Sequence, residues 1–221
     1  MKLLPLSLLG LALLAGCAPK PTSQTNAAVK DTAPATLSEP KVGEAVATLA
    51  GGCFWCVEEE LENLKGVRDV VSGYAGGKLE NPTYEQVGTD QTGHAEAVQV
   101  YYDPKVIPYD TLLTAFFAAH DPTTPDRQGP DIGTQYRSVA FYRTPDEKTR
   151  IDAAIQRTNA SGHFDNPVVT QVVPFTAFYA AEGYHQGYYR AHPENPYVEN
   201  VSKPKVEKFR KAMKAWLKPG L

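Results

Sequence analysis

Cysteine is scarce in this sequence, which contains three in 221 residues: Cys17, Cys53 and Cys56. An exported domain that depends on disulfides uses more cysteines at wider spacing. A structural zinc site needs four ligands, and none of the five histidines forms an HxxxH pair that would complete a set with the cysteines. The scarcity argues against a disulfide scaffold and leaves only weak support for a metal site. We expect neither a metal nor another bound cofactor.

An excess of basic charge is also missing. The chain has 22 Lys and Arg against 25 Asp and Glu, a formal net charge of −3, and the two signs are well mixed. Without a basic stripe, nothing in the sequence favours a nucleic-acid partner. No internal repeat is visible, and the chain after about residue 45 is long enough for one domain with a substantial core. We expect a monomer with one folded domain.

The N-terminus lacks an apolar run long enough to span a membrane, which takes roughly 20 residues. Leu3 to Ala15 is apolar and follows Lys2, a pattern typical of a secretory signal, which we place at residues 1–16. The letters LAGC, ending at Cys17, resemble the bacterial lipoprotein cleavage signal, in which the cysteine becomes the lipid-modified first residue. The alternative is an ordinary signal peptide with a coincidental cysteine. We expect an exported, membrane-anchored lipoprotein on the periplasmic side or at the cell surface.

A polar segment follows the signal. Residues 18–44 are dominated by Pro, Thr, Ala and Ser and show no apolar period. Such a segment buries too little apolar surface to order itself. We therefore predict a lipidated cysteine and flexible tether over residues 17–44, and a folded domain over 45–221.

Strand-like and helix-like patterns alternate through this domain, which favours a two-layer α/β sandwich. Runs rich in Gly, Pro, Asn and Asp predict the loops between them. The expected strands are 44–50, 67–74, 94–103, 136–143 and 167–175; the expected helices are 54–66, 109–120, 144–162 and 202–218, with a short aromatic helix within 178–197; the expected long loops are 75–93 and 121–135.

The stretch GGCFWCVEEE, residues 51–60, places two cysteines three apart at the start of a predicted helix. Its two glycines break the preceding strand, and from Phe54 onward apolar residues recur at helical spacing. Backbone N–H groups at a helix start lower a thiol pKa from about 8.5 towards neutrality, so Cys53 is a candidate nucleophile. A metal clip and a structural disulfide are the other interpretations of the pair. Because ligand and cysteine counts support both poorly, a redox-active pair of Cys53 and Cys56 is the leading one.

The run HAEAVQVYYD, residues 94–103, alternates like a strand. If its valines face the core, Glu96 points inward at the strand's start. Burial would raise the pKa of this carboxyl above about 4.3 and could keep it protonated near neutrality. The alternative is a strand end at which Glu96 reaches water or pairs with a base.

Six motifs follow one another in a consistent order between about residues 46 and 197: GGCFWCVE, GYAGG, NPTYEQV, TGHAEAVQVYYDP, HDPT and GTQYRSVAFY. Together they resemble the peptide methionine sulfoxide reductases of type A. The resemblance implies a two-layer α/β fold and reduction of the S epimer of methionine sulfoxide to methionine. The fold we expect is thus an α+β two-layer sandwich with a mixed sheet, a ferredoxin-like plait core, long loops and a C-terminal helix, and residues 45–221 would be the catalytic domain.

The resemblance also implies roles for individual residues. Cys53 would attack the sulfoxide sulfur as a thiolate and become a sulfenic acid. Glu96, still protonated, would hydrogen-bond the sulfoxide oxygen and donate its proton. Tyr84 and Tyr136 match two family tyrosines that hydrogen-bond the same oxygen. Phe54 and Trp55 match the pocket for the substrate's ε-methyl group. Asp131 matches an acidic residue that contacts the substrate backbone. Each aromatic residue could instead be ordinary packing, and Asp131 could merely cap a turn.

Regeneration is the remaining question, because a sulfenic acid that is not reduced oxidises further. Many members of this family use a cysteine in a C-terminal tail, whereas this chain has none after Cys56. We therefore predict that Cys56 attacks the Cys53 sulfenic acid and forms a Cys53–Cys56 disulfide, which a thioredoxin-like dithiol donor reduces.

The expected partners are this donor, oxidised proteins or peptides containing methionine sulfoxide, and a membrane reached through the lipid anchor. The role would be repair of oxidised envelope proteins, and acceptance of free methionine sulfoxide stays open. Two other function classes also stay open. One is a thiol–disulfide oxidoreductase that acts through the CxxC motif, and the other is a non-enzymatic envelope lipoprotein in which the motif forms a structural disulfide.

Overall fold

The computed structural model describes Met1 and residues 31–221. Apart from Met1, the predicted signal sequence 1–16 lies outside the described residues, as do Cys17 and the tether up to residue 30. Those assignments stay predictions. None of the described helices combines the length and the apolar composition that crossing a bilayer requires.

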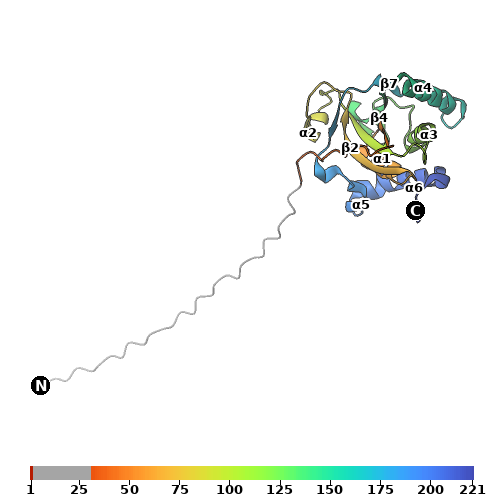
Figure 1. The fold of residues 1–221 in the computed structure, drawn as a ribbon. Coiled ribbons are helices and arrows are strands. Elements are labelled where there is room, and N and C mark those ends of the chain that lie inside the picture. Colours follow the sequence, from red (N-terminus) through yellow and green to blue (C-terminus); the bar gives the residue numbers. More distant parts are fainter. Residues whose placement is uncertain (2–30) are drawn as a thin grey trace.

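Six strands form one mixed sheet in the order β7-β6-β1-β3-β2-β8, in which β6 and β7 pair in parallel and the other neighbours are antiparallel. Figure 1 shows the strands and the helices packed together in one domain. Its four central strands, with α1 between β1 and β2 and α3 between β3 and β6, follow the β-α-β-β-α-β order of a ferredoxin-like plait. The mixed sheet and the plait are both confirmed. The strands are β1 Ala45–Gly51, β2 Val67–Ala75, β3 Ala95–Tyr102, β6 Ser138–Tyr142, β7 Gln171–Pro174 and β8 Phe178–Ala180.

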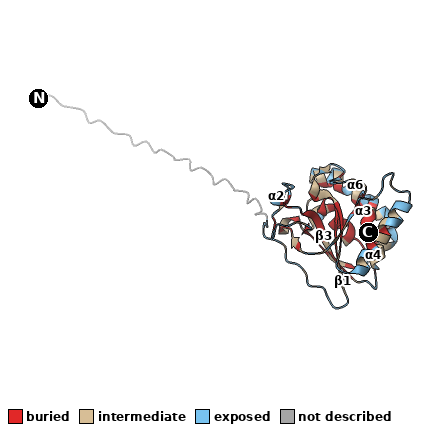
Figure 2. Ribbon diagram, turned by 90° about the horizontal axis from the view of Figure 1, so that it is seen from above, coloured by how far each residue is buried: buried red, intermediate tan, exposed pale blue. Residues whose placement is uncertain are grey.

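Helices cover one face of this sheet and share its larger hydrophobic cluster. Buried residues gather in the sheet and on the sides of the helices that face it (Figure 2). The opposite face has a smaller apolar cluster of its own. The helices are α1 Phe54–Glu62, α2 Tyr84–Val87, α3 Tyr109–Ala119, α4 Pro145–Ala160, α5 Tyr188–Ala191 and α6 Lys203–Ala212.

Strand β3 shows how side-chain alternation directs a polar group towards the helix layer. Val98 and Val100 belong to the larger cluster, while Ala97 and Tyr101 belong to the smaller one on the other face. Glu96 has the same parity as the valines and therefore lies on the helix side, at the start of the strand, as predicted.

The junction between β1 and α1 positions the first cysteine of the CxxC motif. Gly52 has a φ of +90°, and a Cβ at this position would collide with the side chain of Gln128. The strand ends at Gly51 and the helix begins at Phe54, so Cys53 is the N-cap of α1. Only glycine allows this tight turn, and the turn aims the cysteine at the end of the sheet.

Short elements occur where the sequence predicted loops. Residues 75–93 contain α2, which a capping box between Thr83 and Gln86 holds. Residues 121–135 contain a two-stranded ribbon, β4 Arg127–Gln128 with β5 Asp131–Ile132, and the start of a 3-10 turn at Thr134–Tyr136. The predictions of uninterrupted loops were wrong because elements of two to four residues are shorter than the periods used to find them.

The C-terminal helix is shorter than the predicted range 202–218. Helix α6 is preceded by a π turn, Val198–Ser202, and is followed by a 3-10 turn, Lys214–Trp216. A π turn shifts the helical phase, and the predicted range did not allow for this change.

The second half of the predicted tether is attached to the domain. Ala35 N–H donates to the carbonyl of Ala181 at 2.9 Å, and Gly183 N–H donates to the carbonyl of Ala33 at 2.8 Å. Pro34 and Glu182 form an isolated bridge. A flexible tether was predicted up to residue 44, whereas residues 31–35 pair with the domain, because the chain beyond edge strand β8 offers unpaired backbone groups that an extended segment can satisfy.

Candidate active site

A cavity of about 340 Å³ opens where β1 ends and α1 begins. Cys53 and Glu96 line it from the β1–α1 junction and from the start of β3. Most of the predicted site residues meet there, although their numbers span more than eighty positions. The lining residues are Cys53, Phe54, Trp55, Tyr84, Glu96, Asp131, Tyr136, Asn195 and Tyr197.

Cys53 is 6% exposed and lies at the cavity wall as a free thiol. Burial raises the pKa of this thiol well above its ordinary value, the Cys56 thiol and Asp131 raise it further, and the nearby hydroxyl of Tyr197 lowers it. The predicted lowering of the Cys53 pKa by the helix start was therefore wrong, because loss of hydration outweighs the backbone N–H groups. The thiol lines the cavity and is protonated at neutral pH.

Glu96 is buried, with 3% of its surface exposed, and its Oε2 accepts a hydrogen bond from Phe54 N–H at 3.0 Å. Burial raises the pKa of this carboxyl well above its ordinary value; the nearby Cys53 and Asp131 raise it further, and the Phe54 N–H lowers it. The structure thus bears out the inward orientation of Glu96 rather than the alternative of a solvated strand end. A carboxyl in this environment holds its proton at neutral pH and can donate it into the cavity.

Tyr84 and Tyr136 enter the same cavity from α2 and from the 3-10 turn after β5. Both are half-buried, and burial followed by the proximity of Glu96 raises the pKa of each phenol. Both hydroxyls therefore stay protonated over the physiological range. With Glu96 they supply three O–H donors around one space.

Phe54 and Trp55 form an aromatic wall at the start of α1. Phe54 is 1% exposed, whereas Trp55 is half-buried and stacks on Tyr188, with ring centroids 3.8 Å apart and planes 9° apart. The Trp55 indole N–H donates to Nδ1 of His185 at 3.0 Å. These contacts fix the tryptophan ring beside Cys53.

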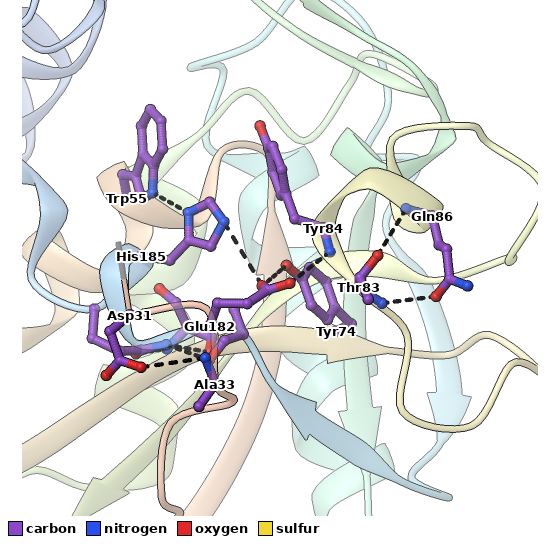
Figure 3. A network of polar contacts seen from close by, with 12 residues as sticks. Asp31, Ala33, Trp55, Tyr74, Thr83, Tyr84, Gln86, Glu182 and His185 are labelled. Atoms are coloured by element: carbon purple, nitrogen blue, oxygen red, sulfur yellow. Dashed lines mark hydrogen bonds and ion pairs between the residues drawn. The ribbon is translucent and has the colours of Figure 1, made fainter. Parts of the chain in front are cut away.

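A polar network behind this wall joins α1 to α2 (Figure 3). Nε2 of His185 lies 3.9 Å from Oε2 of Glu182, whose two carboxyl oxygens accept hydrogen bonds from the Tyr74 hydroxyl and from Tyr84 N–H, both at 3.0 Å. The network therefore fixes Trp55 and Tyr84 relative to one another. The sequence analysis missed Glu182 and His185, since no motif indicated that they would support the site.

Asp131 is held from the opposite side of the cavity. The Tyr197 hydroxyl donates to its Oδ2 at 2.6 Å, and Lys205 Nζ lies 3.9 Å from the same oxygen. Because the carboxylate bonds to a residue 66 positions away, it does more than cap its own turn. Tyr197 was also missed, although it stands at the very end of the resemblance and its segment, Asn-Pro-Tyr, is a recognisable turn.

Cys56 lies on the inner side of α1 and does not line the cavity. It is 2% exposed, its thiol donates to Ser202 Oγ at 3.3 Å, and it lies close enough to Cys53 to raise the pKa of that thiol. Both cysteines are free thiols in the structure. The two thiols thus lie near one another across the first turn of the helix, with Cys53 lining the cavity and Cys56 bonded to the residue before α6. Across residues 31–221, no group of three or more His, Cys, Asp or Glu is arranged to hold a metal ion.

Comparison with known proteins agrees with this geometry. Residues 45–217 match the family described as peptide methionine sulfoxide reductase. Over 176 residues the chain is 53% identical to the peptide methionine sulfoxide reductase MsrA of Thermus thermophilus, a match covering 80% of this chain and 99% of that protein.

Solved structures give the same relationship. The crystal structure of reduced Mxr1 from Saccharomyces cerevisiae superposes with a TM-score of 0.68 at 34% identity, over 72% of this chain and 92% of that one. Mxr1 in complex with Trx2 superposes with a TM-score of 0.50 at 26% identity, over 69% of this chain and 90% of that one.

Proposed function

The chain belongs to the peptide methionine sulfoxide reductase family, and from this membership we propose that it reduces the S epimer of methionine sulfoxide in oxidised proteins through Cys53. The observation that carries the proposal is the meeting of a buried thiol, a protonated carboxyl and an aromatic wall in one cavity. A sulfoxide offers a sulfur to attack, an oxygen to protonate and an apolar methyl group, and the cavity has a counterpart for each.

The first step transfers oxygen from the substrate to the enzyme. The methyl group packs against Phe54 and Trp55, and the sulfoxide oxygen accepts hydrogen bonds from Glu96 and the two tyrosines. The Cys53 sulfur attacks the substrate sulfur while Glu96 gives its proton to the oxygen. The oxygen then passes to Cys53 as the S–O bond of the substrate breaks, and the thiol proton returns to Glu96. The products are methionine and Cys53 sulfenic acid.

The second step closes a disulfide. The Cys56 sulfur attacks the sulfenic sulfur of Cys53, the S–S bond forms, the S–O bond breaks and water leaves. The proximity of the two thiols, three residues apart at the start of α1, supports this assignment.

The third step returns both cysteines to thiols and requires an external dithiol. The complex of Mxr1 with Trx2 supports a thioredoxin-type reductant for this chain as well. If LAGC is the lipoprotein signal that it resembles, the enzyme is exported and anchored through Cys17, and its donor is a thioredoxin-like protein of the same compartment. Oxidised envelope proteins are then its substrates, with Asp131 contacting their backbone.

The test is stereospecific turnover with dithiothreitol as the reductant. We expect the chain from Asp31 to Leu221 to convert the S sulfoxide of a methionine peptide and to leave the R sulfoxide unchanged, and Cys53→Ser to abolish the reaction. Equal rates with both epimers would contradict the proposal. Insulin reduction, measured in parallel, distinguishes a general thiol–disulfide oxidoreductase.

The role of Cys56 is tested separately. Cys56→Ser should form one equivalent of methionine and stop at the sulfenic acid when thioredoxin is the reductant, because no neighbouring thiol can resolve it. Thioredoxin-dependent turnover at the wild-type rate by this variant would remove Cys56 from the mechanism.

A further inference from the structure

Helix α1 carries a carboxyl group that the proposed mechanism does not use. Glu60 is 0% exposed, and neither of its carboxyl oxygens has a hydrogen-bond partner among the described residues. Its neighbours Glu58 and Glu59 are also buried, but their oxygens accept hydrogen bonds from Ser72 and Arg210 respectively. Buried polar groups are normally paired, so the unpaired carboxyl of Glu60 needs an explanation.

The position of Glu60 relates it to the second cysteine. It follows Cys56 by four residues in the same helix, and residues at this spacing share a face with Cβ atoms roughly 5–6 Å apart. Side chains in a helix lean towards its N-terminus, so the Glu60 side chain extends over the turn that holds Cys56. Helix α6 packs against α1, and Ser202, next to its start, accepts the Cys56 hydrogen bond.

The disulfide cycle requires a proton at this place. Cys53 lines the cavity and Cys56 does not, so an external thiolate reaches the disulfide at Cys53. The sulfur that leaves is then Cys56, which is 2% exposed and has little contact with water. A thiolate released into such a site is poorly solvated and leaves slowly unless it is protonated as it forms.

We propose that Glu60 is the acid that protonates Cys56 when a dithiol donor opens the Cys53–Cys56 disulfide. The inference rests on the proposed function, in which that disulfide forms. The Glu60 carboxyl is then unpaired in the reduced protein because its partner is the Cys56 sulfur at the moment when the disulfide opens.

Atoms and charges balance in this step. The donor thiolate attacks Cys53, a mixed disulfide forms, and the Cys53–Cys56 bond breaks with its electron pair on Cys56. The Glu60 proton moves to that sulfur and leaves a carboxylate. The second donor thiol then attacks the mixed disulfide, the oxidised donor leaves, and the proton of that thiol passes to the released Cys53 sulfur. A proton from solvent, equal to the one given up when the donor thiolate formed, reprotonates Glu60.

The surroundings of Glu60 favour the acid form before the step. Burial raises the pKa of its carboxyl well above the ordinary value, and Cys53 and Glu59 raise it further. Lys205, facing it from α6, lowers this pKa and is the positive charge beside the carboxylate after the step.

The experiment compares disulfide reduction in the full chain with Glu60→Gln and Glu60→Leu, using Glu58→Gln as the matched buried-carboxyl control. Each protein is oxidised with one equivalent of methionine sulfoxide, and reduction by dithiothreitol is then followed by alkylation and mass measurement. We expect reduction to be at least tenfold slower in both Glu60 variants and unchanged within twofold in the control. Methionine formation in a single turnover should stay within twofold of wild type in all three.

A pH series separates proton donation from packing. The ratio of the wild-type rate to the Glu60→Gln rate cancels the ionisation of dithiothreitol, and it should fall towards one as the pH rises and Glu60 loses its proton. Glu60→Asp should recover part of the rate that Glu60→Leu loses.

Two results would overturn the inference: reduction within twofold of wild type in both variants, or an equal loss in methionine formation and in reduction. If Glu60→Gln does not fold, Glu60→Leu, which fills the site with an apolar side chain, carries the test. If the wild-type protein makes methionine but its mass never falls by the two hydrogens lost when a disulfide forms, the result contradicts the proposed function instead.

Discussion

Cys53 and Glu96 are both buried and both neutral at physiological pH, and this shared property shapes the chemistry. Neither has to be stored as an ion in a poorly hydrated cavity, which would be costly. In the proposed mechanism, charge develops only while the thiol attacks and the carboxyl gives up its proton, and Glu96 regains a proton before the step is over. Activation therefore depends on the substrate, whose oxygen provides the proton acceptor.

Glu96→Gln tests this pairing. The amide oxygen can still accept the Phe54 N–H hydrogen bond, but the side chain has no acidic proton to give. We expect the single-turnover rate of methionine formation to fall about 10²–10⁴-fold, the usual contribution of a positioned acid. Rapid quench at pH 7 measures it, and Glu58→Gln is the control. A loss below tenfold would show that the two tyrosines are sufficient as donors.

Glu60 should reduce the stability of the fold. An unpaired buried polar group typically lowers the unfolding free energy by about 1–3 kcal/mol. We therefore expect Glu60→Leu to raise that free energy by about this amount, whereas Glu60→Gln should give little gain because its amide is also unpaired. Urea unfolding of the reduced proteins at pH 7 provides the measurement. A less stable leucine variant would mean that the site cannot accommodate the larger apolar shape.

Individual site residues were predictable to different degrees. Cys53 and Glu96 stood out because a thiol at a helix start and a carboxyl on an apolar strand face are unusual by themselves. The pKa direction of Cys53 was not predictable, since the depth of burial depends on chain segments far away in sequence. Tyr197 and Glu60 escaped notice because a tyrosine in a turn and a glutamate in an acidic run look ordinary until packing shows their partners.

The extended stretch from Asp31 to Ala35 is the element whose role differs most from expectation. It supplies backbone hydrogen bonds to the segment after β8, including Tyr184 N–H to the Asp31 carbonyl at 3.1 Å. That segment also carries Glu182 and His185, which fix Tyr84 and Trp55. The N-terminal stretch thus reinforces the support of the active site from outside.

A chain that begins at Lys41 should be less stable than one that begins at Asp31. It lacks three backbone hydrogen bonds to residues 181–184 and the bond from Ser38 to Asp69. At about 0.5–1.5 kcal/mol net for each bond, and less at the exposed ends, we expect a loss of about 1–3 kcal/mol. The melting temperature should fall by about 2–4 °C for each kcal/mol. Equal melting temperatures, measured by calorimetry, would show that the pairing adds nothing.

Helices and strands long enough to repeat their pattern of apolar residues were predictable, and the shorter ones were not. Strands β1, β2, β3 and β6 and helices α1, α3 and α4 were placed near their observed bounds, because alternation and helical spacing repeat within each of them. Helix α2 and strand β8 are too brief to show a period. The π turn before α6 alters the phase of a helix without a signal in composition, yet it separates Tyr197, which reaches Asp131, from Ser202, which reaches Cys56.

Across the whole molecule, buried carboxyls should make stability depend on pH. Burial raises the pKa of Glu58 to about 8, and those of Glu60 and Glu96 are raised as well. The folded state keeps protons that the unfolded chain has released above about pH 4.5, so the unfolding free energy falls as the pH rises towards 8. His120 acts in the opposite sense: burial lowers its pKa to about 4, and its contribution rises with pH up to about 6.5.

Between pH 6.5 and 8 the contribution of His120 no longer changes, so the buried carboxyls determine how the unfolding free energy depends on pH. We expect the unfolding free energy to fall there by up to about 1.4 kcal/mol per pH unit for each carboxyl that titrates. Urea unfolding at pH 6.5 and 8 measures the slope, and Glu58→Gln should flatten it. A stability that rises over this interval would mean that these carboxyls are ionised in the folded protein.

If the chain is anchored through Cys17 as we propose, the attachment of the N-terminal stretch also sets how far from the membrane the catalytic domain can reach. Asp31 is the fourteenth residue after Cys17, and Glu44 is the twenty-seventh. A linker spans at most about 3.6 Å per residue. From Cys17 to Asp31 it therefore spans at most roughly 50 Å, whereas a linker that stayed unpaired up to Glu44 would span roughly 95 Å. For the lipid-anchored enzyme that we propose, the accessible volume shrinks about sevenfold and the local concentration near the bilayer rises by the same factor. Under that proposal, the pairing of these five residues with the domain keeps the enzyme in the layer next to the membrane.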